Sequence, residues 1–297
     1  MAEKMPADCV PSRQAWFIQR FLKDFLIPDM VLYVQKRGRK GSIHMKNAII
    51  SARSVCKSFA HNGGQVHILT GLDLDIYEGD FTVIMGASGS GKSTMLYALS
   101  GMDRATGGQV LFQGEDIVKM REKKLAALRR GKFGFIFQQM HLVSNLSLFE
   151  NITVPGYLNQ TRSAAETDQR AEQLMEQMGI AKIRTHLPAQ CSGGEQQRCA
   201  IARAVINSPD MLFADEPTGA LNRKNTTEVL DLLTELNRAG QSILMVTHDA
   251  RAACRATRLI YIEDGRVVGE LELPPYTEAE EKSRETQIGA WLAAMEW

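Results

Sequence analysis

The chain has 297 residues, 44% of them hydrophobic and 23% charged, and a formal net charge of +1. This composition is ordinary for a globular protein, and the near-zero charge excludes a general electrostatic attraction to nucleic acid or to an acidic membrane. The five cysteines are scattered and form no C-x-x-C pair, which argues against a disulfide framework or a zinc site and favours a reducing compartment.

Residues 1–44 differ from the rest of the chain. Aromatic and apolar residues recur at helical spacing before Pro28, and a basic, glycine-containing run follows at 36–41. The pattern allows a membrane-surface anchor, a disordered tail, or an extension upstream of a true start at Met45, and we expect one of the last two. The segment does not resemble a secretory signal. No apolar run in the sequence approaches the length of a membrane-spanning helix, so we expect a membrane role to need a partner.

From Asn47 onward the pattern becomes regular. Residues 48–55 predict a strand, residues 59–64 a turn, and residues 72–76 a half-exposed strand in which apolar and polar residues alternate. Residues 109–112 predict a further antiparallel strand. We expect these strands to form a layer of their own.

Short apolar runs predict buried strands at 81–85, 133–137, 211–214 and 243–246. Helical patterns lie between them, at 95–99, 116–130 and 224–238, and the alternation of strands and helices predicts a parallel α/β core. Residues from about 145 to 190 are expected to be purely helical, with a capping box that opens a helix at 163–166. Asp264-Gly265 lies between two apolar runs and indicates a hairpin.

The most informative stretch follows the first buried strand and consists of Gly86, Ala87, Ser88, Gly89, Ser90, Gly91, Lys92, Ser93 and Thr94. It matches the P-loop pattern in the strand-to-helix context that this motif requires. Glycines let successive backbone N–H groups point at an anion, and the helix that begins there adds its positive dipole end. Lys92 can reach the β- and γ-phosphates, and the Ser93 hydroxyl can ligate Mg²⁺. The stretch therefore predicts nucleotide binding.

The ends of three other buried strands carry polar side chains. Asp215 is placed to hold Mg²⁺, directly or through water, and Glu216 is placed to polarise the attacking water. Gln138 could touch both Mg²⁺ and that water, and His248 could hydrogen-bond the γ-phosphate. Taken alone, Gln138 is typical of a surface residue and His248 of a structural one. Their order and spacing along the chain favour the functional interpretation.

A second candidate anion site lies in the run from Cys191 to Arg198. The Ser192 hydroxyl and the glycine pair Gly193-Gly194 stand at the start of a predicted helix, which is a favourable place for an anion. One chain thus carries two phosphate-binding devices. Both reach one γ-phosphate most easily if two copies pair head to tail and complete each other's sites.

With these motifs, residues 47–272 resemble the ATPase subunit of an ABC transporter. The resemblance maps the Walker A motif onto Gly86–Thr94, the Q-loop onto Gln138, the signature onto Ser192, Gly193, Gly194, Glu195 and Gln196, Walker B onto Met211–Asp215 with catalytic Glu216, and the switch histidine onto His248. Phe59 falls where the family stacks an aromatic ring on adenine, and its alternative is a core aromatic. The chain departs from the pattern at Cys191, where leucine is usual, and at Asn222, where the D-loop usually has aspartate.

The subgroup is indicated by residues 135–139, 192–198 and 214–221, which are similar to those of the macrolide-exporter, lipoprotein-release and bacitracin-resistance ATPases. Residues 288–297 resemble the short terminal helix of antimicrobial-peptide transporters in that group. The resemblance implies a P-loop NTPase fold of the α/β class over residues 45–272, with an antiparallel β layer and a helical subdomain at about 140–190. A helical tail is expected at 273–297.

The resemblance further implies an ATPase with ATP and Mg²⁺ as cofactors, a second copy as dimer partner, and no nucleic-acid partner. The chain would lie on the cytoplasmic side of the cell membrane and power a separate permease. That permease would export or extract an antimicrobial peptide, a lipoprotein or a lipophilic compound. The alternative is a non-transporting ABC ATPase that signals through a membrane partner in cell division or cell-wall control. Chromosome-maintenance relatives are disfavoured because no sustained heptads separate Thr94 from Ser192.

Overall fold

The structure is a computed structural model, and it describes residues 46–61 and 64–295. The interpretations of residues 1–44 as an anchor, a tail or a misassigned start therefore lie outside the described residues. Among the described residues, none of the helices combines the length and the apolar character needed to cross a bilayer.

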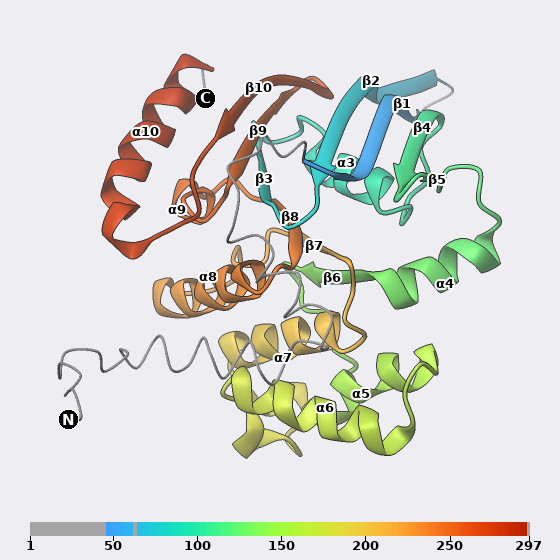
Figure 1. Cartoon of the computed structure of the whole chain (residues 1–297), viewed down its shortest axis with the longest axis vertical. Coiled ribbons are helices and arrows are strands. Elements are labelled where there is room, and N and C mark those ends of the chain that lie inside the picture. The colour runs from blue at the N-terminus through green and yellow to red at the C-terminus, as the bar shows by residue number, and fades with distance from the viewer. Residues whose placement is uncertain (1–45, 62–63, 296–297) are drawn as a thin grey trace, which may run out of the picture. The chain divides into compact units, whose positions relative to one another are not determined.

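A six-stranded sheet forms the centre of the fold, in the order β10-β9-β3-β8-β7-β6 (Figure 1). Its strands are β3 (Phe81–Met85), β6 (Phe133–Phe137), β7 (Met211–Asp215), β8 (Ser242–Val246), β9 (Arg258–Glu263) and β10 (Arg266–Glu272). All neighbours are parallel except β9 and β10, which form the predicted hairpin. In this register Val246 is opposite both Ile84 and Asp215, so the carboxyl ends of β3, β7 and β8 meet at one edge.

A four-stranded antiparallel sheet, in the order β2-β1-β4-β5, forms the predicted second layer. It contains β1 (Ala48–His61), β2 (Gly64–Tyr77), β4 (Gly107–Phe112) and β5 (Glu115–Asp116). The turn predicted at 59–64 begins too early, because Phe59 still pairs with Val66 and His61 with Gly64. Phe59, Ala60 and the residues of β2 opposite them are exposed. The sequence therefore has no alternation of apolar and polar residues there that would predict a strand.

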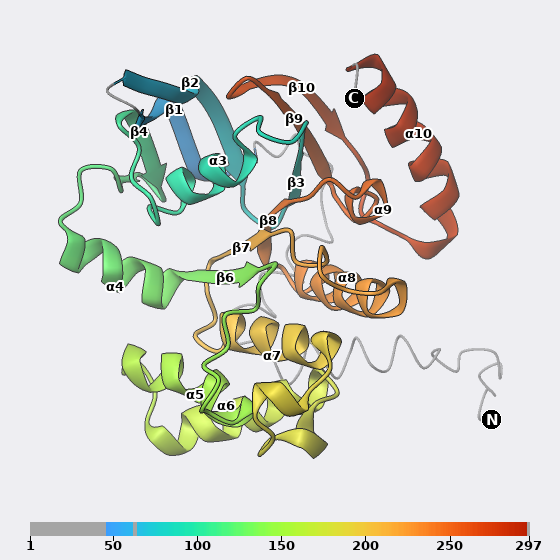
Figure 2. The same ribbon diagram turned by 180° about the vertical axis from the view of Figure 1, so that it is seen from behind.

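The described helices are α3 (Lys92–Leu99), α4 (Glu122–Lys132), α5 (Leu148–Asn159), α6 (Ala164–Gln177), α7 (Gly193–Val205), α8 (Arg223–Arg238), α9 (Ala250–Ala253) and α10 (Glu281–Ala294), with short 3₁₀ turns η1 (Ala181–Ile183), η2 (Pro188–Gln190) and η3 (Glu278–Glu280). Helices α5, α6 and α7 pack together, away from the antiparallel sheet (Figures 1 and 2). Helix α4 begins later than the predicted residue 116, because β5 and a turn come first. Helix α10 begins earlier than the predicted residue 288.

One buried apolar cluster joins the two sheets and includes the inner face of α3. Phe133 lies at its centre, with its ring centroid 4.7 Å from that of Phe112 in β4 and 5.1 Å from that of Phe213 in β7. Edge-on aromatic pairs of this kind add about 0.5–1.5 kcal/mol each to the burial term. Helix α3 also packs in this cluster between the two sheets. This packing fixes the helix, whose first residues belong to the predicted P-loop.

Candidate nucleotide site

The predicted P-loop connects β3 to α3 through glycines in conformations that other residues rarely adopt. Gly86, Gly89 and Gly91 have φ values of 154°, 83° and 96°. A Cβ atom on Gly86 would lie 2.2 Å from the carbonyl oxygen of Ile262, so only glycine fits between the loop and β9. The loop thus turns tightly and delivers Lys92 to the N-terminus of α3.

Lys92 is buried, and its ammonium donates to the carbonyl oxygens of Gly86 at 2.8 Å and Ala87 at 2.7 Å. Burial lowers the pKa of Lys92, and the charges of Glu216 and Asp215 oppose that shift. No described carboxylate forms an ion pair with this ammonium, and a buried charge without a counter-ion is costly. The buried Ser90 hydroxyl of the same loop also lacks a described hydrogen-bond partner. These groups fit an anionic ligand such as a phosphate chain.

Asp215, at the end of β7, has both carboxylate oxygens in hydrogen bonds with α3. Ser93 Oγ donates to Oδ1 at 2.9 Å, and Tyr97 Oη donates to Oδ2 at 2.7 Å. Burial and the bond to Asp215 raise the pKa of Tyr97, so its hydroxyl remains a donor. Carboxylate and hydroxyl oxygens are ligands that Mg²⁺ prefers, so Asp215 and Ser93 fit that ion. Tyr97 belongs to none of the motifs in the sequence, although its spacing of four from Ser93 places both on one helix face.

Glu216 follows directly and has a left-handed backbone, with φ at 47°. Its N–H donates to the carbonyl oxygen of Val246 at 2.9 Å, and its Oε2 lies 3.1 Å from His248 Nδ1. Gln138 lies beside the same carboxylate: a Cβ atom on Gly219 would be 2.8 Å from Gln138 Nε2 and 3.3 Å from Glu216 Oε2. The structure therefore gathers the side chains that were predicted from three separate strand ends.

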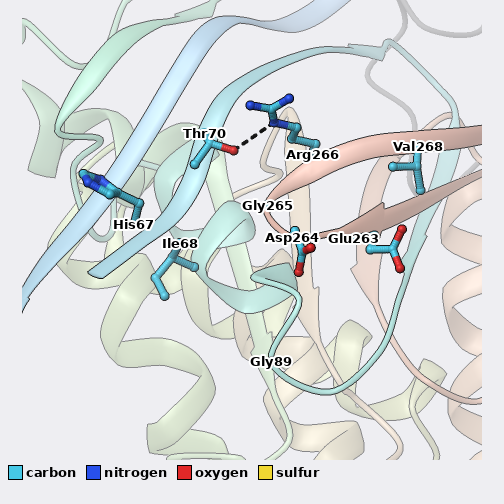
Figure 3. Close-up of a pocket in the computed structure, with 9 residues that line it drawn as sticks. All are labelled: His67, Ile68, Thr70, Gly89, Glu263, Asp264, Gly265, Arg266 and Val268. Carbon is cyan, nitrogen blue, oxygen red and sulfur yellow. Dashed lines mark hydrogen bonds between the residues drawn. The ribbon is translucent and has the colours of Figure 1, made fainter. Parts of the chain in front are cut away.

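A cavity of about 620 Å³ borders the P-loop at Gly89 (Figure 3). Its walls come from β2 and from the β9–β10 hairpin, and the lining residues are His67, Ile68, Thr70, Gly89, Glu263, Asp264, Gly265, Arg266 and Val268. The hairpin is held against the loop, since the Gly265 N–H donates to the Ser90 carbonyl oxygen at 3.2 Å. Arg266 Nε donates to Thr70 Oγ1 at 3.0 Å and closes one side.

Phe59 lies near the end of β1, and its side chain is 43% exposed. This exposure excludes the alternative of a core aromatic. The ammonium of Lys57 lies 4.8 Å from the Phe59 ring centroid and is itself held by Asp103 and by the Arg104 carbonyl oxygen. A cation–π contact thus steadies an exposed ring on which a flat base could stack.

The predicted second anion site begins α7, and Ser192 is its N-cap. Glu195 Oε2 accepts from the Ser192 N–H at 2.8 Å and from Ser192 Oγ at 2.7 Å, while the Glu195 N–H donates to Ser192 Oγ at 3.4 Å. Gln196 Nε2 donates to the Cys191 carbonyl oxygen at 3.0 Å. Ser192 and Glu195 bond to each other, whereas Gln197 donates to the Phe137 carbonyl oxygen and Arg198 pairs with Glu228. None of the described side-chain bonds of this segment reaches the P-loop. Gly193 lies next to Leu221 and Met140 instead.

The chain matches a known protein family. Residues 69–219 match the family described as ABC transporter. The chain is 45% identical over 227 residues to the macrolide export ATP-binding/permease protein MacB of Bradyrhizobium diazoefficiens, a match that covers 76% of this chain and 34% of that protein. It is 43% identical, with the same coverage, to the pyoverdine export ATP-binding/permease protein PvdT of Pseudomonas fluorescens. The chain thus spans about a third of the length of the curated relatives that it matches.

Solved structures give the same fold. The dimeric post-hydrolysis structure of the ATP-binding cassette MJ0796, bound to ADP and Pi, superposes with a TM-score of 0.71 at 36% identity. That match covers 76% of this chain and 100% of the solved one. The structure of cbiO1 from Clostridium perfringens, part of the ABC transporter complex cbiONQ, superposes with a TM-score of 0.69 at 25% identity. This second match covers 82% of this chain and 93% of the solved one.

Proposed function

Because this chain belongs to the ABC transporter family, we propose that it is the ATP-hydrolysing subunit that powers a membrane exporter. The chain is an ABC ATPase with the P-loop NTPase fold of that family. The observation that carries the proposal is that Lys92, Asp215 and Glu216 all end or follow strands whose carboxyl ends meet at one edge of the six-stranded sheet. It joins a phosphate-binding amine, a metal-binding carboxylate and a candidate base.

We assign the chemistry to these side chains as follows. The P-loop and Lys92 would bind the triphosphate, and Ser93 and Asp215 would hold Mg²⁺, which would supply positive charge beside the phosphate oxygens. Glu216 accepts the proton of the attacking water, and its contact with His248 orients the carboxylate. Gln138 lies beside Glu216, where its amide can align the same water.

We also propose that two copies form the working unit. The capping box of Ser192 and Glu195 uses their own N–H groups and leaves those of Gly193 and Gly194 without a described partner, so two N–H groups at the start of α7 are available to a phosphate held by another molecule. The MJ0796 cassette, whose whole length matches this chain, was solved as a dimer. Phe59 would stack on the adenine of the nucleotide, since its ring is exposed and steadied by Lys57.

The partner and location belong to the proposal as well. The curated relatives are named as export ATP-binding/permease proteins, and this chain matches about a third of their length. We therefore propose a membrane permease as partner and a peripheral location on the cytoplasmic side. An antimicrobial peptide, a lipoprotein or a lipophilic compound is the proposed cargo, and residues 140–190 would transmit closure to the permease.

Replacement of Glu216 by glutamine tests the assignment. The Glu216→Gln variant should bind ATP as the wild type does and lose most of its turnover, because only the proton acceptor is removed. It should also accumulate as an ATP-bound dimer in size-exclusion chromatography with light scattering. Glu172→Gln, which changes an exposed carboxylate on α6, is the matched control and should hydrolyse ATP normally. Near-normal hydrolysis by Glu216→Gln would remove Glu216 from this role.

A further inference from the structure

Tyr97 and Ser93 lie on the same face of α3 and together occupy both carboxylate oxygens of Asp215. The position of Tyr97 is itself fixed by the loop that follows the helix. Its carbonyl oxygen accepts the N–H groups of Met102 at 3.0 Å and Asp103 at 3.2 Å. These bonds fix the main chain at Tyr97, and the hydrogen bond to Asp215 Oδ2 directs the phenol.

The chemistry of the donor matters because Asp215 is the residue assigned to the metal. A lysine or arginine in place of Tyr97 would neutralise the carboxylate and compete with a cation. A phenol donates one hydrogen bond and leaves the negative charge in place. Such a bond to a charged group is stronger than one between neutral groups, and it favours one rotamer of the carboxylate. With Oδ2 held by Tyr97, Oδ1 remains on the side of Ser93, the other assigned ligand.

We propose that Tyr97 is a positioning residue that orients Asp215 for the Mg²⁺ of the bound nucleotide. This inference rests on the proposed function, in which Asp215 serves the metal. Groups that hydrogen-bond a metal ligand from outside typically change metal affinity about 10–100-fold when removed. Tyr97 would act in this way because it holds the Asp215 carboxylate in the orientation that binds the ion, so the carboxylate need not reorient on binding.

The Tyr97→Phe variant removes the hydroxyl and keeps the ring. We expect Mn²⁺ to bind about tenfold more weakly to the variant with a non-hydrolysable ATP analogue, measured by electron paramagnetic resonance titration. Affinity for a fluorescent ATP analogue in EDTA should stay unchanged, because the P-loop contacts are intact. ATPase activity should fall at low Mg²⁺ and recover at high Mg²⁺. Unchanged Mn²⁺ affinity would overturn the proposal.

Tyr157→Phe is the matched control, because its hydroxyl also donates to a carboxylate, that of Asp168 in the helical region. It should leave Mn²⁺ affinity unchanged, and an equal loss in both variants would overturn the assignment to Tyr97. Thermal unfolding of both variants separates metal binding from stability. The wild type supplies the test of the underlying function: failure to bind ATP in EDTA would contradict the nucleotide site itself. Normal ATP binding with unchanged Mn²⁺ affinity in Tyr97→Phe would contradict only the role of Tyr97.

Discussion

The two segments that we propose to bind phosphate differ in how far one molecule completes them. At the P-loop, Lys92 donates to main-chain carbonyl oxygens, and Ser93 donates to the carboxylate of Asp215. Asp215 lies on β7, far from the P-loop in the sequence. At the start of α7, Ser192 and Glu195 bond only to each other. The capping box uses the N–H groups of Ser192 and Glu195 and leaves those of Gly193 and Gly194, the first two residues of α7, for an outside ligand. We therefore expect the first segment to be ordered within one molecule and the second to be completed by a nucleotide that another molecule holds.

The largest expected effect comes from placing a mutation in each segment on a different copy of the chain. Lys92→Ala removes a phosphate contact, and Ser192→Arg places a bulky cation at the second segment, so each variant alone should be inactive. If the sites pair head to tail, a mixed dimer has one site with both lesions and one with neither. The mixture should therefore recover part of the wild-type ATPase rate.

The control for this experiment is a mixture of each variant with itself, at the same total concentration. Heterodimers are confirmed by two different affinity tags. An inactive mixture in which heterodimers demonstrably form would contradict independent head-to-tail sites. A wild-type chain that hydrolyses ATP at full rate at high dilution would contradict the need for a partner.

A smaller effect tests how α7 is attached to the sheet. Gly134 lies in β6 beneath α7, and a Cβ atom there would be 2.5 Å from the Ala204 carbonyl oxygen and 2.7 Å from Leu212 Cδ1. Gly134→Ala should lower the free energy of unfolding by about 1–3 kcal/mol, since overpacking forces helix and strand apart. Urea denaturation followed by circular dichroism measures it. A change of less than about 0.5 kcal/mol would show that α7 is loosely seated.

Gly114→Ala is the matched control for that experiment. Gly114 has φ at 86°, and a Cβ atom added there would have no heavy atom within 4 Å, so alanine brings backbone strain without a clash. The expected loss is about 1–2 kcal/mol, from the left-handed conformation alone. It should leave nucleotide-induced dimerisation unchanged, whereas Gly134→Ala should weaken it because α7 carries the second segment.

The smallest expected effect concerns Asn222. Its Oδ1 accepts the Asn225 N–H at 3.0 Å, so Asn222 is the N-cap of α8. Asn222→Ala should cost about 1 kcal/mol of unfolding free energy, while Asn222→Asp should stay within about 0.5 kcal/mol because aspartate caps equally well. Chemical denaturation of both variants measures this. A large loss in Asn222→Asp would show that its neutral amide matters beyond the cap.

The sequence predicted the catalytic edge better than the ends of the elements. Continuous apolar runs identified the buried parallel strands, and the order and spacing of the polar residues after them singled out Asp215, Glu216 and His248. The structure shows that these strands end at a common edge. The sequence did not predict the end of β1, because Phe59 and its neighbours are exposed on a long hairpin. There the strands remain paired beyond the point where apolar and polar residues alternate. The role of Tyr97 required knowing how α3 is rotated against β7, which local spacing does not specify.

Glu216 holds its carboxylate beside His248 from a left-handed backbone. Non-glycine residues in such conformations cost on the order of 1–3 kcal/mol, a large share of the roughly 5–15 kcal/mol that keeps a domain folded. Glycine at position 216 would relieve that strain and remove the carboxylate that we propose as the base. Stability and the proposed catalytic turnover therefore place opposite demands on residue 216. Selection for thermal stability alone would favour substitutions there that yield a well-folded but inactive ATPase.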